Sequence, residues 1–124
     1  GSPWVAFRLD DLGAFLARHD RYDEALACYE EALAIRRTVL GEDSLWVGAN
    51  LNSLAELARQ TGDLAGAEPL YVEALEVYDR ATEDHPATVA EWRAEAAKGL
   101  AAVRDEAERD EAERDEAEPS ADGQ

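Results

Sequence analysis

The chain repeats itself at a distance of 42 residues, and this period limits its possible folds more than any other feature. Residues 25–33 match residues 67–75: each segment carries Ala, then Tyr four residues on, then Ala three residues further, then Leu. Steps of three and four residues place such side chains on one face of an α-helix. Small Ala beside large Tyr also lets two helices approach closely. The repeat therefore predicts helices that pack in pairs.

Turn signals divide each unit into two helices. Helices are expected over about 4–18, 22–39, 45–60, 64–80 and from about 87 onward, with no convincing strand pattern anywhere. Ser44 is expected to cap the third helix, and Gly41 and Gly62 fall at turns. On the first helix, one apolar stripe is predicted to contain Leu9, Leu12, Phe15 and Leu16.

Several coupled motifs within this period resemble the tetratricopeptide repeat family, in the longer-period form seen in kinesin light chains. The resemblance covers roughly residues 5–103. Its departures are mild, because Ser53 replaces a second Asn and Asp20 stands where the first turn usually has Gly. The motifs are Leu51-Asn52-Ser53-Leu54-Ala55, Gly62, Gly66-Ala67-Glu68-Pro69-Leu70-Tyr71, Ala74-Leu75-Glu76-Val77, Ala32-Leu33-Ala34-Ile35, Val39-Leu40-Gly41-Glu42-Asp43 and Asp84-His85-Pro86.

The resemblance implies an all-α fold of two helix-turn-helix repeats and a capping helix, stacked as a short right-handed solenoid. Such proteins are usually binding scaffolds and not enzymes. The expected division is a remnant of cloning over 1–3, repeats over 4–41 and 42–82, the cap over 83–103, a charged helical extension over 104–118 and a disordered end over 119–124.

The first helix of each pair would line a concave groove that holds a peptide or a partner helix. Asn52 is the best recognition candidate, because an Asn side chain can bond both the N–H and the C=O of a peptide backbone; the alternative is a solvated polar position. The full set of expected peptide-binding residues is Asp10, Asp11, Asn52, Glu56, Arg59, Glu91, Glu95 and Lys98.

The charges of this set indicate which peptides fit. Family members that clamp the acidic C-termini of chaperones use Lys and Arg where this chain has Asp10, Ser53, Glu91 and Glu95. An acidic ligand would meet like charge there, so a basic or mixed-charge peptide is favoured over a chaperone tail.

The overall balance is acidic, with 12 Lys and Arg against 29 Asp and Glu and a formal net charge of −17. It argues against nucleic acid and anionic membranes as partners, since both are negative. No apolar run is long enough to span a membrane. The single cysteine, Cys28, suits a reducing compartment, and we expect a cytoplasmic protein.

No constellation of residues indicates catalysis, a metal or a cofactor. His19 and His85 fall in different connectors, and Cys28 lies among packing residues on a helix. The sequence has no glycine-rich phosphate loop, no paired cysteines and no helical His-Glu-x-x-His.

The N-terminal end begins apolar, where the end of a solenoid should be polar. Trp4 and Phe7 there are candidates for self-association as a homodimer; alternatively the chain is a fragment of a larger repeat protein. Trp92 is expected to pack between repeats, whereas Trp46 either packs or anchors a partner. The segment 104–118 repeats Arg-Asp-Glu-Ala-Glu three times and is expected to extend the last helix into solvent; the alternative is that it attracts a basic partner.

Overall fold

The computed structural model describes residues 2–81 and 85–117. They form five α-helices and no strand, which confirms the all-α class. Residue 1, the expected boundary at 82/83 and the expected disordered end 119–124 lie outside the described residues. The helices are α1 (Pro3–Arg18), α2 (Tyr22–Leu40), α3 (Leu45–Gln60), α4 (Leu64–Arg80) and α5 (Pro86–Ala117).

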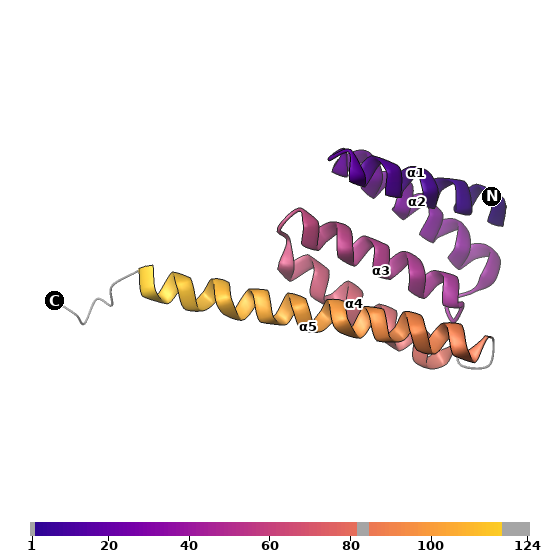
Figure 1. Cartoon of the computed structure of the whole chain (residues 1–124). Coiled ribbons are helices and arrows are strands. Elements are labelled where there is room, and N and C mark those ends of the chain that lie inside the picture. The colour runs from indigo at the N-terminus through magenta and orange to yellow at the C-terminus, as the bar shows by residue number, and fades with distance from the viewer. Residues whose placement is uncertain (1, 82–84, 118–124) are drawn as a thin grey trace.

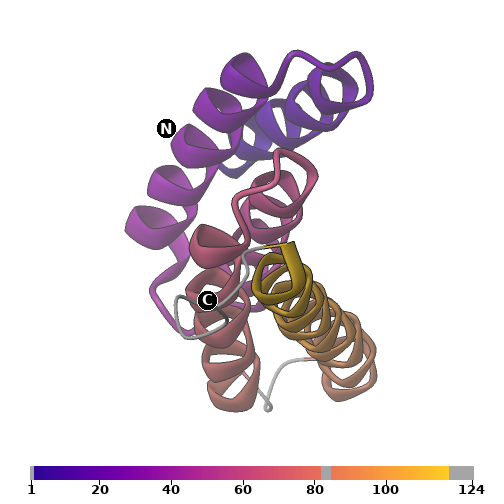
Figure 2. The ribbon, with the colours of Figure 1, turned by 90° about the vertical axis from the view of Figure 1, so that its left-hand side faces the viewer.

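The helices form two antiparallel hairpins and a closing helix (Figure 1). Viewed along the helices, α1, α3 and α5 follow one another on one side of the stack, and α2 and α4 lie on the other (Figure 2). This is the arrangement of a short α-solenoid with two repeats and a cap. It places three helices that start at the same end of the molecule next to one another.

Two side chains fix where the second hairpin's helices begin. Ser44 caps α3, because its Oγ accepts a hydrogen bond from the Trp46 amide at 3.2 Å, as the sequence predicted. Asp63 caps α4 in the same manner, its Oδ1 accepting from the Gly66 amide at 2.9 Å. Each cap satisfies one amide at a helix start that has no partner within the helix.

The turns inside the two hairpins both use left-handed backbone. Gly62 has φ of +85°, a conformation that a residue without Cβ adopts at little cost. In the first hairpin Asp20 has φ of +62°. Asp is one of the few other residues that visits this region, which explains why it can stand where the family usually has Gly.

Tyrosine rings packed on glycines set the close spacing of the helices. A Cβ added at Gly48 would lie 2.5 Å from Cε1 of Tyr78, so only glycine leaves room for the ring. The same relation occurs three times, each time between two helices. The pairs are Tyr29 on Gly13, Tyr78 on Gly48 and Tyr71 on Gly99.

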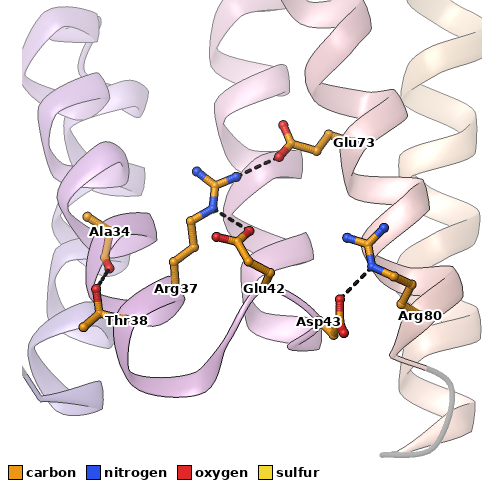
Figure 3. A network of polar contacts seen from close by, with 7 residues as sticks. All are labelled: Ala34, Arg37, Thr38, Glu42, Asp43, Glu73 and Arg80. Carbon is orange, nitrogen blue, oxygen red and sulfur yellow. Dashed lines mark hydrogen bonds and ion pairs between the residues drawn. The ribbon is translucent and has the colours of Figure 1, made fainter.

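Ion pairs link the repeats on the side of α2 and α4 (Figure 3). Arg37 on α2 donates to Glu73 on α4 at 2.7 Å and to Glu42 in the connector at 3.1 Å. Arg80 donates to Asp43 at 2.6 Å. These groups are largely exposed, so each pair contributes about 0.2–1 kcal/mol at most, and together they fix the connector to both repeats.

The predicted apolar stripe of α1 is only partly buried. Leu16 is buried, but Leu12 and Phe15 are 47% and 50% exposed. The residues 42 positions later, Leu54 and Leu57, are buried between the two hairpins. The equivalent apolar face of α3 is buried against a neighbouring hairpin, whereas no described residue covers this face of α1.

Helix α5 runs without interruption into the charged segment and projects beyond the hairpins (Figure 1). Arg104 on α5 donates to Glu68 on α4 at 3.0 Å, and Glu106 accepts from Arg59 on α3 at 2.6 Å. Further along, Arg109 pairs with Asp105 one turn back, as the i,i+4 spacing predicted. The start of the extension is therefore held against the repeats.

Candidate binding groove

The groove side of the molecule is formed by one face of each of α1, α3 and α5. Hollows open between these helices, and one of about 410 Å³ lies between α1 and α3. Glu56 borders this hollow and two others toward α5. We define the groove by the residues around these hollows that project from the three helices: Ala14, Arg18, Ser53, Glu56, Arg59, Gln60, Glu95, Lys98, Gly99, Ala102 and Glu106.

Four of the eight predicted peptide-binding residues border the groove: Glu56, Arg59, Glu95 and Lys98. Asp11 and Glu91 are exposed on α1 and α5. The remaining two, Asp10 and Asn52, are partly buried on α1 and α3. A role for any of them in binding remains a prediction.

Glu56 is the electrostatic centre of the groove. Burial raises the pKa of its carboxyl group above the ordinary 4.5, and repulsion from Glu95 raises this pKa further. Asn52 and Arg59 lower the pKa, but the net shift is upward. The charge of Glu95 thus opposes ionisation of Glu56, and a cation placed beside Glu56 would favour it.

Arg59 is already engaged by the chain itself. Its Nε and Nη2 both donate to Oε1 of Glu106, at 3.0 and 2.6 Å. This hydrogen bond is also the main reason that the pKa of Arg59 is raised. Glu106 in the α5 extension therefore pairs with Arg59, which is the cationic residue closest in sequence to Glu56.

Asp10 belongs to a buried network that the sequence reasoning missed. Arg36 on α2 is 2% exposed, and its Nη1 contacts Asp10 Oδ2 and Asn50 Oδ1, both at 2.5 Å. Asn50 in turn donates to Asp10 Oδ1 at 2.8 Å. Burial raises the pKa of Asp10, although Arg36 and Asn50 lower it. The network links α1, α2 and α3.

Asn52, expected to read a peptide backbone, has a buried Oδ1 that accepts no hydrogen bond from any described residue. Asn50, two residues earlier, is the asparagine that the fold buries fully. One signal in the sequence pointed to it: a polar residue between Val47 and Leu54 on the apolar face of α3.

Four aromatic rings lie in a row at the end of the groove where α1, α3 and α5 begin. The ring centroids are 6.4 Å apart for Trp4 and Phe7, 4.8 Å for Phe7 and Trp46, and 5.3 Å for Trp46 and Trp92. The Arg36 guanidinium lies against the second and third rings, with Cζ 5.0 and 5.3 Å from their centroids. We call these four residues the aromatic row.

The described residues offer little for catalysis. They contain no group of three or more His, Cys, Asp or Glu side chains placed to hold a metal ion. Burial raises the pKa of the Cys28 thiol, which favours the unreactive protonated form. None of the helices in residues 2–81 and 85–117 is both long enough and apolar enough to span a bilayer.

The fold and the groove define the class of protein, and the sequence agrees. The profile of the tetratricopeptide repeat family matches residues 6–80, so the chain belongs to this family, as predicted. Among curated proteins no sequence matches. The crystal structure of BtubC (BKLC) from P. vanneervenii is similar to the chain, with a TM-score of 0.56 and 20% identity. The likeness covers 93% of this chain and 50% of BtubC, so the chain spans half the length of that structure.

Proposed function

We propose that the protein is a scaffold that binds a basic or mixed-charge peptide, or a partner helix, in its acidic groove. Proteins of its family bind other proteins and are generally not enzymes. The observation that carries the proposal is the pair Glu56 and Glu95: one carboxyl has a raised pKa because of burial and the other's charge. Arg59 is bound to Glu106, which leaves Lys98 as the other cation at this hollow, so a lysine or arginine from a partner would add positive charge beside the two carboxylates.

The same charges argue against a partner with an acidic C-terminus. A carboxylate ligand would enter a groove that already holds the carboxylates of Glu56 and Glu95, at a cost in affinity. The acidic chain also disfavours nucleic acid and anionic membranes. The single cysteine suits a reducing compartment, which supports our proposal that this function is cytoplasmic.

The experiment that tests this proposal is affinity capture from a lysate of the source cell with Glu56→Lys/Glu95→Lys beside the wild type, at low and high salt. A matched control, Glu76→Lys/Glu111→Lys, makes the same change in net charge at exposed positions away from the groove. We expect a partner that the wild type and the control retain, and that the groove variant loses. Equal capture by all three proteins would refute the acidic groove as the binding site.

A second function, self-association through the apolar N-terminal end, is favoured by one specific observation. Val5, Leu12 and Phe15 are exposed on α1, whereas the residues 42 positions later are buried in the stack. An exposed face of this kind is a place where a second copy could pack. The predicted residues Trp4 and Phe7 are exposed as well, but both belong to the aromatic row.

Sedimentation equilibrium distinguishes these possibilities. If the protein forms a homodimer through this end, Phe15→Glu should shift the mass to that of a monomer. Trp4→Ala tests the predicted tryptophan separately. A wild-type protein that stays monomeric at hundreds of micromolar would exclude self-association as its function.

A further inference from the structure

The aromatic row contains all three tryptophans of the chain, contributed by three different helices. Core packing accounts for only part of it, because Trp4 is 77% exposed and Phe7 is 39% exposed. Large apolar side chains left in solvent are typical of the anchor points of protein interfaces, where Trp is enriched.

The row and the groove carboxylates lie on the same helix faces. On α3, steps of three and four residues lead from Trp46 through Ser53 to Glu56, and on α5 a single turn leads from Trp92 to Glu95. Trp46 and Glu56 are ten residues apart, which is about 15 Å along a helix. The groove thus has an aromatic end and an acidic end.

The inner surface of the row is already occupied by a cation. Arg36 lies against the rings of Phe7 and Trp46, and its Nη1 is held by Asp10 and Asn50. This buried support fixes the two rings in place before any partner arrives, which lowers the entropic cost of binding. A second cation on the same rings would be repelled by Arg36, so the row suits an uncharged apolar side chain.

We propose that the aromatic row is the anchor site of the groove, and that the partner segment places a bulky apolar or aromatic side chain there. This inference rests on the proposed function, because the same segment would put its basic residues at Glu56 and Glu95. An extended segment advances about 3.3 Å per residue, so about 15 Å places the cation four or five positions along the chain from the anchor.

Two synthetic peptides test the proposal. The first has one Phe, four Gly or Ser residues and two Arg residues, and the second has Ser in place of the Phe. Neither peptide contains Trp. Because every tryptophan of the protein lies in the row, selectively excited tryptophan emission reports on this site alone.

We expect the Phe peptide to shift the emission to shorter wavelength and to bind about tenfold more tightly than the Ser peptide, from partial burial of one aromatic side chain. Trp4→Ala, at a position exposed enough to leave folding intact, should reduce this difference to about twofold or less. Val39→Ala, an exposed apolar position on α2 outside the groove, should preserve the difference.

The failures of the two proposals are distinguishable. Equal affinity for the Phe and Ser peptides, or a difference that Trp4→Ala does not change, would overturn the anchor site while leaving the acidic groove standing. If Glu56→Lys/Glu95→Lys binds both peptides as tightly as the wild type, the acidic groove itself is refuted. Absence of binding by either peptide would overturn both.

Discussion

Replacing Arg36 by Met tests whether the buried network of Arg36, Asp10 and Asn50 holds the first three helices together. The side chain is 2% exposed, and its Nη1 contacts oxygens of Asp10 and Asn50, both at 2.5 Å. Met keeps much of the volume between the rings of Phe7 and Trp46 but strands the carboxylate. Breaking a buried ion pair costs about 3–5 kcal/mol, and we expect the lower value because the Asp10 side chain is 26% exposed.

The assay is urea unfolding followed by far-ultraviolet circular dichroism. A loss of about 3 kcal/mol, with a slope of about 1.5–3 kcal/mol per molar urea, lowers the midpoint by about 1–2 M. Asp10→Asn alone should also destabilise the protein, because it strands the guanidinium. The double variant should cost at least about 1.5 kcal/mol less than the sum, since neither charge is then left alone. Additivity within about 0.5 kcal/mol would refute the reasoning.

Three further predictions concern the groove and the stack. Gly48→Ala should destabilise the protein by about 1–3 kcal/mol in the same unfolding assay, because the added methyl group overlaps the buried ring of Tyr78; an unchanged midpoint would contradict the proposed packing. The free energy of unfolding should increase as pH falls from 7 toward 4.5, because the raised pKa of Glu56 makes the folded state bind a proton more tightly than the unfolded state. Glu56→Gln should flatten this pH dependence. An identical pH profile for the variant and the wild type would contradict the role of Glu56. Arg59→Ala should lower stability by less than about 1 kcal/mol yet speed amide hydrogen exchange in α5 around Glu106, whereas unchanged exchange would show that the ion pair does not hold the extension.

The helices were predictable because their signals are local. The Ser44 cap and the turn at Gly62 depend on residues within one turn of each other, and the structure has both where the sequence placed them. The spacing of three and four residues also identified the apolar face of each helix correctly where a neighbour covers it, as for Leu54. Local sequence patterns therefore predicted most of the fold.

The features that could not be predicted from the sequence depend on which residues of other helices pack against a given side chain. Periodicity shows that Phe15 is on an apolar face, but only the arrangement of the hairpins shows that no described residue covers it. Likewise Arg36 reads as an ordinary surface arginine, and its burial follows from Asp10 and Asn50 arriving from two other helices. The resemblance to the family predicted the groove, whereas its aromatic end became apparent only from the positions of the rings in the structure.

The parallel course of α1, α3 and α5 gives the groove an electrical direction (Figure 1). Aligned peptide dipoles place partial positive charge at helix starts and partial negative charge at helix ends. The starts gather at the aromatic row, and the ends of α1 and α3 lie toward the opposite end, beyond Glu56. A segment with its cations at one end would therefore be bound in one orientation, with the cations toward Glu56 and away from the helix starts.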